Sequence, residues 1–461
     1  MSSSSDQKLG HIALLPSSGM GHLTPFFRLA ALLSSNNVKI TFITPNSTVS
    51  MAESQTLTHF FASLPHINQK QFHLLPLEKT PNNTKDPFYC HMDCIRQSAH
   101  FLSPTLASLS PPLSAVITDM SLAAAFIPIT QALNLPNYVL FTSSAKMLTL
   151  FLSYHTMISS KTVTDLNEFH MFKIPGLEEA IPRSWIPPPL LENTNNSFKT
   201  YFVENGKKMV ESSGILVNTF DSIEQEAIRK LNDKVERLPP VVAIGPLAAC
   251  EFEKGKLLAW LDGQPDRSVM YVSFGSRTAM SREQIRELSE GLVESGARFL
   301  WIVKDKKVDL EDGEDLNKVI GSWLTDRLKE KGLVVKAWLK QEDILRHPAV
   351  GGFMSHCGWN SVTEAVRHGV PILAWPQHGD QKINASIVER IGLGNWVKSW
   401  GWGGEIIVDG TEIAEKVKEV MESEVLRAQA MNIREEAKRA VAVGGSSSNR
   451  LIELMQTWKK L

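Results

Sequence analysis

A histidine and an aspartate follow two apolar, strand-like segments of the first half. His22 closes the segment Gly19-Met-Gly-His22, just after the apolar run Ile12–Pro16, and Asp119 ends the run Ser114–Thr118. The carboxyl ends of parallel strands share one edge of a sheet, so the two side chains are expected at the same edge. A carboxylate beside an imidazole fixes its tautomer and raises its basicity. The pattern is therefore typical of a general base, His22, with Asp119 as its partner.

Each of these residues also has a structural interpretation. His22 could be a surface or packing histidine, and Asp119 could cap the helix that follows it. The position of His22 does not decide between a base and a packing residue. Asp119 can be the partner of His22 and a helix cap at the same time. A dinucleotide-binding loop is disfavoured because Thr24 stands where G-x-G-x-x-G needs its third glycine. The next strand also ends at Thr44-Pro45, without the acidic residue that would bind a ribose.

A second group of polar and aromatic residues lies between positions 338 and 381. His356-Cys-Gly358 is predicted to turn from a strand into a helix that starts near Asn360-Ser361. The N–H groups and dipole of a helix N-terminus favour a diphosphate. The side chains of His356, Asn360 and Ser361 can add hydrogen bonds to it. Glu364 could accept both hydroxyls of a ribose, and Trp338 could stack on a base. The alternative is a capped core helix with a buried tryptophan, but the joint spacing favours a nucleotide site.

Short apolar segments alternate with helical segments in both halves of the chain. This alternation predicts an α/β fold with parallel sheets covered by helices on both faces. Thr24 is predicted to cap the first helix, with Pro25 at its first position. The predicted strands are Ile12–Pro16, Val38–Thr44, Ser114–Thr118, Tyr138–Phe141, Val269–Phe274, Phe299–Val303, Val334–Ala337, Val350–Met354 and Pro371–Trp375.

The alternation stops and restarts around Leu238-Pro-Pro-Val and Ile244-Gly-Pro246, which predicts a linker between two domains. We expect a Rossmann-like domain over residues 1–243, a second over 250–445, and a C-terminal helix over 446–461. Two open sheets would then face each other, with ligands at the carboxyl ends of the strands in the cleft between them.

Composition excludes several classes of protein. The 461 residues include 48 basic and 49 acidic side chains, so bulk charge argues against a nucleic-acid partner. Four cysteines exclude a disulfide scaffold and fit a cytoplasmic protein. Cys90 and Cys94 have no second pair at zinc spacing, and no metal motif is evident. The apolar run after the N-terminus is too short for a membrane span or a signal segment, so no membrane partner is expected. Nothing indicates oligomers, and a monomer is the default expectation.

The 44 residues from Trp338 to Gln381 resemble the signature box of plant UDP-dependent glycosyltransferases of family 1. The resemblance covers the whole chain, because His22, Asp119 and the late helix also fall where that family has them. It implies a GT-B fold, with the C-terminal helix packing back on the N-terminal domain. It further implies an inverting, metal-independent reaction with UDP-glucose as donor substrate and no permanently bound cofactor.

The resemblance also implies roles for individual residues. Trp338 would stack on uracil, Leu339 would act through its backbone, and Gln341 would help to hold the uridine. Glu364 would bind the ribose hydroxyls. The other implied donor contacts are Ser276, Arg277, His356, Asn360 and Ser361 with the diphosphate, and Thr142, Trp359, Asp380 and Gln381 with the sugar. Arg277 offers a forked donor suited to phosphate, although a solvated surface arginine explains it nearly as well. One departure is Leu339-Lys340, where the family usually has Ala or Val followed by Pro.

A narrower resemblance points to the plant flavonoid C-glycosyltransferases. It rests on Asp86-Pro-Phe88, Arg96–His100, Ile181–Leu191, Phe274–Arg277 and Ser399–Glu405. It implies glucose transfer to an aromatic carbon of dihydrochalcones such as phloretin, or of 2-hydroxyflavanones. The expected acceptor contacts are Phe88, Trp185, Pro187 and Leu190. Tyr89-Cys90-His91 departs from the apolar residues expected there.

Two other functions compete with this one. A flavonoid or phenol O-glucosyltransferase of the same fold would differ in how the acceptor is held. A non-catalytic protein that binds a nucleotide sugar or a flavonoid would be expected to have lost His22 or Asp119, and both are present.

Overall fold

A computed structural model describes residues 10–76, 86–159, 170–174, 177, 179–194, 196–233, 238–250, 259–304, 318, 320, 322–336 and 339–460. The chain divides into two compact units. Unit 1 consists of Met1–Arg183, Pro189–Phe252 and Ala440–Leu461, and unit 2 consists of Ser184–Pro188 and Glu253–Arg439. The short segment Ser184–Pro188 therefore belongs to unit 2, although the chain on both sides of it belongs to unit 1.

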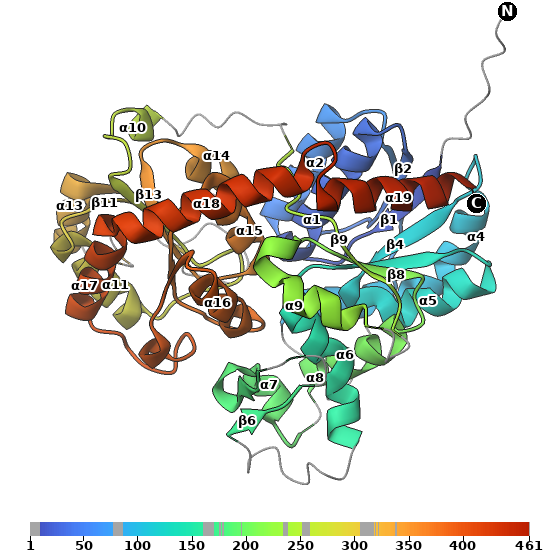
Figure 1. Ribbon diagram of the computed structural model, residues 1–461, viewed down its shortest axis with the longest axis horizontal. Helices are drawn as coiled ribbons and strands as arrows, with labels where there is room; N and C mark the ends of the chain where they lie inside the picture. Colours follow the sequence, from blue (N-terminus) through green and yellow to red (C-terminus); the bar gives the residue numbers. More distant parts are fainter. Residues whose placement is uncertain are drawn as a thin grey trace, which may run out of the picture. The chain divides into compact units, whose positions relative to one another are not determined.

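Unit 1 is built on a parallel sheet with the strand order β3-β2-β1-β4-β5-β8-β9 (Figure 1). Its strands are β1 (His11–Leu15), β2 (Lys39–Pro45), β3 (Asn68–Phe72), β4 (Ala115–Asp119), β5 (Asn137–Phe141), β8 (Gly214–Val217) and β9 (Val241–Ala243). Its helices are α1 (Met20–Ser35), α2 (Met51–Ser63), α3 (Pro87–Ser98), η1 (Ala99–Phe101), α4 (Leu102–Ala107), η2 (Met120–Leu122), α5 (Ala123–Ala132), α6 (Ala145–Ser159), α8 (Ser197–Met209), α9 (Asp221–Leu231) and α19 (Ser446–Lys460). A small antiparallel pair, β6 (Met171–Phe172) with β7 (Ile181–Pro182), precedes η3 (Arg183–Trp185) and α7 (Pro188–Leu191).

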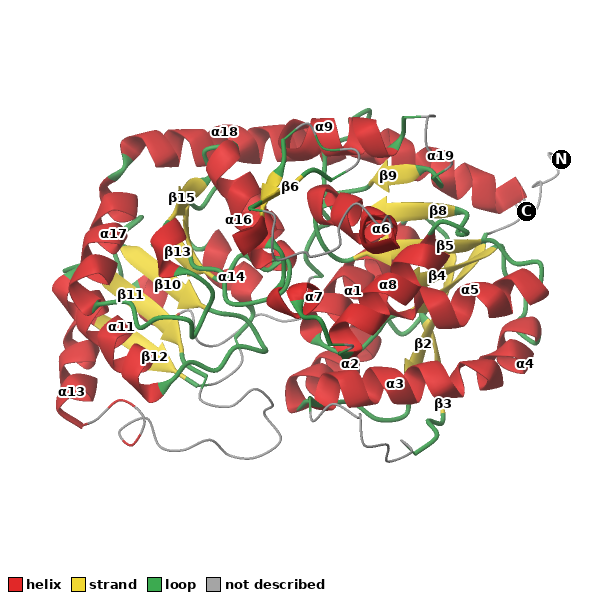
Figure 2. Ribbon diagram, turned by 90° about the horizontal axis from the view of Figure 1, so that it is seen from below, coloured by secondary structure: helices red, strands yellow, loops and turns green. Residues whose placement is uncertain are grey.

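Both faces of this sheet are buried, as a parallel sheet requires (Figure 2). Alternate residues of β1 enter different cores because successive side chains of a strand point to opposite faces. Ile12 and Leu14 pack with residues of α1, α2 and α19, whereas Ala13 and Leu15 pack with residues of α3, α4 and α5. The short apolar runs of the sequence are therefore buried strands.

Unit 2 contains a second parallel sheet, in the order β12-β11-β10-β13-β14-β15. Its strands are β10 (Val269–Ser273), β11 (Arg298–Ile302), β12 (Gly332–Val335), β13 (Val350–Ser355), β14 (Ile372–Ala374) and β15 (Gly394–Trp396). Its helices are α10 (Ala259–Asp262), α11 (Arg282–Glu294), α13 (Ser322–Lys331), α14 (Gln341–Arg346), α15 (Trp359–His368), α16 (Gln381–Arg390), η5 (Lys398–Trp400) and α17 (Gly410–Glu422), while α18 (Glu424–Val441) ends in unit 1. Phe274, Trp375 and Trp400 form an aromatic row in its core, with ring centroids 5.5 and 4.5 Å apart.

The first helix begins earlier than the sequence predicts. Helix α1 starts at Met20 with Gly19 as its N-cap, so the prediction that Thr24 and Pro25 start the helix is wrong. The backbone N–H groups of His22 and Leu23 both bond to the Gly19 carbonyl at 2.9 Å, which closes the first turn before the proline is reached. Gly19 has a φ of 96°, a conformation that favours glycine. His22 consequently lies in the first turn of a helix and not in a loop.

The C-terminal helix packs within unit 1. In α19, drawn red in Figure 1, Leu451, Leu454 and Trp458 are buried in the same core as β1. The Trp458 ring meets the Tyr138 ring of β5 edge to face, with centroids 5.4 Å apart. Helix α19 is therefore part of the same hydrophobic core as β1, the first strand of the chain.

The strand order places a topological switch point in each unit. In unit 1, β1 and β4 are neighbours, and the chain runs outward from them in opposite directions. In unit 2, β10 and β13 occupy the same positions. Ligands of open α/β sheets bind beyond the carboxyl ends of such strands, so these two edges are where a site is expected.

Candidate active site

His22 and Asp119 meet at the switch point of unit 1. Nδ1 of His22 lies 2.8 Å from Oδ2 of Asp119 and 3.2 Å from Oγ1 of Thr142, the residue after β5. Asp119 is fully buried, whereas the side chain of His22 is 27% exposed. A carboxylate can only accept, so the proton of the neutral imidazole is assigned to Nδ1, and Nε2 is then the nitrogen that carries the basic lone pair.

Asp119 also caps the helical turn that follows it. Its second oxygen, Oδ1, accepts hydrogen bonds from the backbone N–H and the hydroxyl of Ser121, at 2.8 and 2.6 Å. These bonds hold the carboxylate in one orientation while Oδ2 faces His22. Asp119 therefore caps this turn and contacts His22 at the same time.

A buried glutamate holds the turn in front of His22. Oε1 of Glu53 accepts the backbone N–H of Gly19 at 2.9 Å, and Oε2 accepts that of Val49 at 3.0 Å. Glu53 lies in the first turn of α2, where Ser50 caps the helix by accepting the backbone N–H of Glu53. The sequence analysis missed Glu53, although Ser50-x-x-Glu53 is the spacing of a capping box.

Helix α3 borders the same turn with an aromatic ring and an imidazole. A Cβ atom placed on Gly19 would lie 3.6 Å from the Phe88 ring and 3.9 Å from Cδ2 of His22, so the two rings flank one point. His91 bonds through Nδ1 to the Ser18 hydroxyl and through Nε2 to the Ser47 carbonyl at 3.0 Å. His91, one of the residues that depart from the expected apolar pattern, therefore links the turns that follow β1 and β2.

At the switch point of unit 2, His356 is enclosed by two glycines. The last residues of β10 and β13, Ser273 and Ser355, are register partners, which brings Gly275 and His356 together just beyond them. A Cβ on Gly275 would lie 2.5 Å from Nε2 of His356, and one on Gly358 would lie 2.6 Å from it. The pKa of His356 is lowered to about 3, first by burial of the ring and then by the nearby His378. At neutral pH this imidazole is uncharged.

The N-terminus of α15 follows directly. Gly358 is its N-cap and provides no side-chain hydrogen bond to the first turn. Trp359 and Ser361 are buried and Asn360 is half-buried. Backbone N–H groups and a helix dipole at the carboxyl edge of a sheet suit a diphosphate, with His356 beside them.

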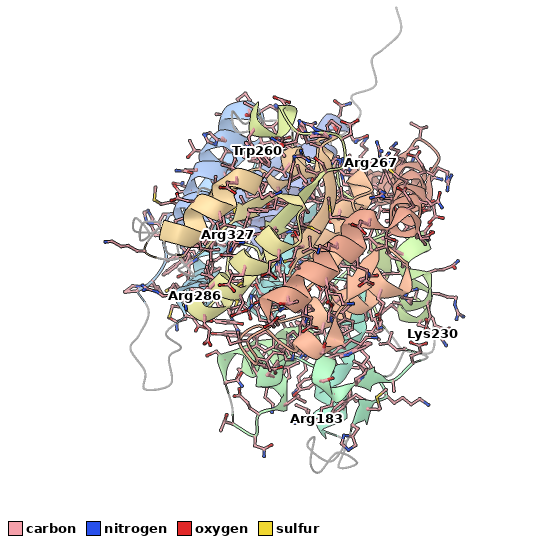
Figure 3. All side chains as sticks on the ribbon, turned by 90° about the vertical axis from the view of Figure 1, so that its left-hand side faces the viewer. Arg183, Lys230, Trp260, Arg267, Arg286 and Arg327 are labelled. Carbon is pink, nitrogen blue, oxygen red and sulfur yellow. The ribbon has the colours of Figure 1, made fainter. Side chains whose placement is uncertain are left out.

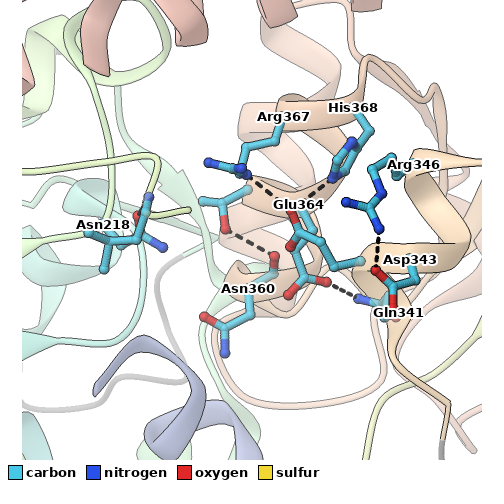
Figure 4. A network of polar contacts seen from close by, with 11 residues as sticks. Asn218, Gln341, Asp343, Arg346, Asn360, Glu364, Arg367 and His368 are labelled. Carbon is cyan, nitrogen blue, oxygen red and sulfur yellow. Dashed lines mark hydrogen bonds and ion pairs between the residues drawn. The ribbon is translucent and has the colours of Figure 1, made fainter. Parts of the chain in front are cut away.

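Further along α15, Glu364 is bonded to Gln341, the first residue of α14 (Figure 4). Nε2 of Gln341 donates to Oε2 of Glu364 at 2.7 Å and to Oγ of Ser361 at 2.9 Å. The hydroxyl of Tyr271 donates to Oε1 of the same amide at 3.3 Å. This network fixes a buried carboxylate on α15 three residues after Ser361. Its contact with a ribose stays a prediction. Leu339 is half-buried, and Trp338 lies outside the described residues.

The chain resembles known proteins over most of its length. Residues 204–436 match the family described as UDP-glucoronosyl and UDP-glucosyl transferase. The chain is 52% identical over 460 residues to UDP-glycosyltransferase 708G2 of Citrus unshiu, covering 97% of this chain and 96% of the relative. It is 43% identical over 451 residues to UDP-glycosyltransferase CGT of Oryza sativa subsp. japonica, covering 96% and 95%. The crystal structure of LpCGTa in complex with UDP matches with a TM-score of 0.86 at 45% identity, over 98% of this chain and 99% of that one.

The chain belongs to the plant family 1 UDP-glycosyltransferases. Within that family it groups with the CGT relatives. The predicted GT-B fold class is confirmed by the two parallel Rossmann-like sheets and the structural match. The enzyme class and the UDP-sugar donor are likewise those of the family.

In this UDP-glycosyltransferase, the side chain of Gln381 is hydrogen-bonded to the loop that precedes it. Its Oε1 accepts the backbone N–H groups of Gln377 and His378 at 2.8 and 2.9 Å. A sugar contact would therefore come from its Nε2 group. Asp380, the N-cap of α16, accepts through Oδ2 from Nδ2 of Asn384 at 2.8 Å.

Two further residues predicted to contact the diphosphate lie in the loop after β10. Ser276 and Arg277 are both half-buried. The Ser276 carbonyl accepts a hydrogen bond from Nζ of Lys304 at 3.1 Å, which ties this loop to the end of β11. A cation thus stands beside the glycine turn that borders His356.

The predicted acceptor residues are divided between the two units. Phe88 lies beside His22, but Trp185 and Pro187 belong to the segment grouped with unit 2. Leu190 has no exposed surface, and its carbonyl accepts a hydrogen bond from the Tyr154 hydroxyl. Leu190 would touch an acceptor only if its neighbours moved.

A second buried carboxylate that was not predicted from the sequence lies at the start of α6, the helix that follows Thr142. The buried Glu224 accepts the backbone N–H groups of Ala145 and Lys146 at 3.0 and 2.9 Å, and so caps α6. Ser144 caps the same helix by accepting the backbone N–H of Met147 at 3.2 Å. Nothing in the local sequence pairs Glu224 with a helix that starts 79 residues earlier.

No helix within the described ranges is long and apolar enough to cross a membrane. Over the same residues, no group of three or more His, Cys, Asp or Glu side chains is placed to hold a metal ion.

Proposed function

We propose that this UDP-glycosyltransferase transfers glucose from UDP-glucose, with inversion, to an aromatic carbon of a flavonoid-type polyphenol. Dihydrochalcones such as phloretin and 2-hydroxyflavanones are the proposed acceptors. The observation that carries the proposal is the His22–Asp119 pair, 2.8 Å apart and bordered by the Phe88 ring. Support for C-transfer comes from the similarity to the rice CGT enzyme and LpCGTa, and from the sequence segments that resemble flavonoid C-glycosyltransferases.

On the acceptor side, Nε2 of His22 takes the proton of a phenolic hydroxyl. Asp119 stabilises the imidazolium that forms, because its carboxylate already accepts the Nδ1 proton. The resulting phenolate is ambident, and in a ring with three meta-related hydroxyls the ortho carbon carries much of the negative charge. The atom held about 3–3.5 Å from the anomeric carbon, in line with the leaving group, is the one that reacts.

On the donor side, the bond between the anomeric carbon and the diphosphate oxygen breaks as the new bond to the acceptor carbon forms. Negative charge accumulates on the departing UDP. The N-terminus of α15 and the neutral His356 are proposed to stabilise it, and Glu364 to bind the ribose. Attack from the face opposite the diphosphate converts the α-glucoside into a β-C-glucoside. Loss of the hydrogen on the attacked carbon restores the aromatic ring.

An O-glucosyltransferase remains the competing assignment, because His22 would activate the same phenol and only the pose of the acceptor would differ. The test is incubation of the purified protein with UDP-glucose and phloretin, followed by mass-spectrometric fragmentation of the product. Cross-ring losses from the sugar without loss of the whole hexose would establish C-transfer. Loss of the intact hexose would establish O-transfer and overturn the proposal.

A variant with His22→Ala provides the control. We expect it to bind UDP but to form no glucoside. If UDP binds to the wild-type protein but no phenol is ever glucosylated, the chain is a nucleotide-sugar binding protein instead of a transferase.

A further inference from the structure

The segments Ser184–Pro188 and Ser399–Glu405 both contact Lys382, a residue to which the proposed reaction assigns no role. Both belong to unit 2, and both were noted in the sequence only for their resemblance to C-glycosyltransferases. Lys382 lies between them. It is the second residue of α16 and directly follows Gln381.

Lys382 is a buried cation with two partners. Only 5% of its surface is exposed. Its Nζ donates a hydrogen bond to the carbonyl of Ser184 at 3.1 Å and lies 4.3 Å from the centre of the Trp402 ring. Burial lowers the pKa of Lys382, while Glu405 opposes that change. A lysine is rarely buried unless its ammonium group is satisfied, so the position depends on these contacts.

A second contact holds the same segment. The Trp185 ring packs against the Trp396 ring of β15 with centroids 5.0 Å apart. Nζ of Lys398 lies 5.5 Å from the centre of the Trp396 ring. Trp396 is itself 7% exposed, so it offers a fixed surface for Trp185.

The turn that carries Trp402 is joined to the loop before Gln381. A Cβ on Gly403 would lie 2.0 Å from Oε1 of Gln377, so the Gln377 side chain packs directly against the backbone of this turn. Oε2 of Glu405 accepts the backbone N–H of Trp402 at 2.8 Å and closes the turn. Gln377 in turn donates its backbone N–H to Gln381. The glycine-rich turn, the loop Gln377–Asp380 and Lys382 thus form one packed structure.

We propose that Lys382 is a positioning residue that, with Trp396 and Trp402, docks Ser184–Pro188 and thereby restricts how the acceptor binds. The proposal rests on the proposed function in one respect, because it takes Trp185 and Pro187 of this segment as the acceptor contacts that the sequence predicts. Docking holds Ser184 against Lys382 and Trp185 against Trp396. A fixed loop narrows the set of acceptor poses, and the pose decides whether carbon or oxygen attacks.

Three variants test this role. Lys382→Met keeps a long side chain on Trp402 but removes the charge and the hydrogen bond to Ser184. Lys382→Arg keeps a donor and a cation that stacks on indole, and should restore docking. Lys416→Met is the matched control, because Lys416 is a partly exposed lysine of unit 2 that pairs with Glu419 at 2.7 Å.

The first measurement needs no acceptor. Trypsin can cleave after Arg183, which is labelled in Figure 3 and has a half-buried side chain. The peptide beginning at Ser184 is quantified by mass spectrometry during native digestion with UDP present. Loss of a hydrogen bond and a cation–π contact should raise this cleavage rate roughly 5- to 30-fold in Lys382→Met. Unchanged cleavage would overturn the docking.

The second measurement separates positioning from general damage. In Lys382→Met the KM for phloretin should rise and the share of O-glucoside in the product should increase, while the KM for UDP-glucose stays within about twofold. Lys382→Arg and Lys416→Met should behave like the wild type. Faster cleavage with an unchanged acceptor KM and product ratio would confirm docking but overturn its role in acceptor binding. If the wild type rejects phloretin, the proposed acceptor fails, and the cleavage rates still decide the docking.

Discussion

The carboxylate of Asp119 divides its two oxygens between Ser121 and His22. One oxygen accepts two hydrogen bonds from Ser121, and the other lies 2.8 Å from Nδ1 of His22. An amide in place of this carboxylate could keep the bonds to Ser121 while presenting an NH2 group to the imidazole. The histidine would then carry its proton on Nε2 and lose its lone pair as a base.

Asp119→Asn should therefore lower kcat by about 10²–10⁴-fold, the usual contribution of general base catalysis. The KM for UDP-glucose should change little, because Asp119 belongs to unit 1, whereas the residues predicted to bind the uridine and the diphosphate belong to unit 2. Steady-state kinetics with thermal denaturation as a control for folding would measure this. A variant that retains full kcat would show that His22 does not act as the base.

Gly358 is predicted to be essential for donor binding because it makes room for His356. A Cβ there would lie 2.6 Å from Nε2 of the imidazole, whereas the backbone of Gly358, with a φ of −57°, would tolerate alanine. Gly358→Ala should displace the ring and raise the KM for UDP-glucose roughly 10- to 100-fold, as for loss of a hydrogen bond to a charged group. Gly263→Ala is the control, since its nearest neighbour is the Trp260 carbonyl at 3.6 Å. Equal KM values for the two variants would argue against a contact between His356 and the diphosphate.

The pair His22–Asp119 could be predicted because β1 and β4 are short apolar runs with clear ends. Adjacent parallel strands place the residues that follow them at one edge, and this topology is common to open α/β sheets. His356 could be predicted in the same way, because it directly follows the apolar strand β13. Local capping was also predictable, as Ser281 accepts the backbone N–H of Gln284 at 3.2 Å.

Strands that are polar or very short were not predictable. Strand β3 reads Asn-Gln-Lys-Gln-Phe, and only Phe72 is buried. Its extended form comes from pairing with β2 and not from an apolar pattern. Strands β8, β9 and β15 have three or four residues each, too few for periodicity to identify.

The contacts that support the site could not be predicted from the sequence either. Glu53, Glu224 and Lys382 bond to backbone groups of distant segments, and such partners are set by tertiary packing alone. Gln381 was predicted from a resemblance as a sugar contact, but its bonds to the loop Gln377–His378 are visible only in three dimensions.

Gln381 is predicted to have two separable roles. Gln381→Glu keeps an oxygen that can accept the backbone N–H groups of Gln377 and His378, but it loses the NH2 donor. Gln381→Leu loses both. We expect Gln381→Leu to lower the free energy of unfolding by about 1–3 kcal/mol, because two backbone N–H groups, of which that of Gln377 is buried, lose their acceptor. Gln381→Glu should unfold near the wild-type temperature yet show a raised KM for UDP-glucose. If both variants are equally unstable, or if Gln381→Glu keeps the wild-type KM, the proposed sugar contact is wrong.

The lowered pKa of His356 predicts that the protein loses stability on mild acidification. In the folded protein its pKa is about 3, compared with 6.5 for an unperturbed histidine, so between these values the unfolded chain binds the extra proton. The stabilisation is fully present above pH 6.5 and is lost as the pH falls toward 3. At pH 5 the loss from this residue should be about 2 kcal/mol relative to pH 7.5.

Urea unfolding at pH 7.5 and pH 5, in the wild type and in His356→Gln, measures this contribution. Other histidines and the carboxylates titrate in both proteins, so the difference between the two pH dependences isolates His356. The variant should lose less stability than the wild type over this interval. Adding UDP should reduce the acid-induced loss in the wild type, because a bound diphosphate favours the protonated imidazole. Parallel pH dependences for the two proteins would mean that His356 is solvated and titrates normally in the folded state.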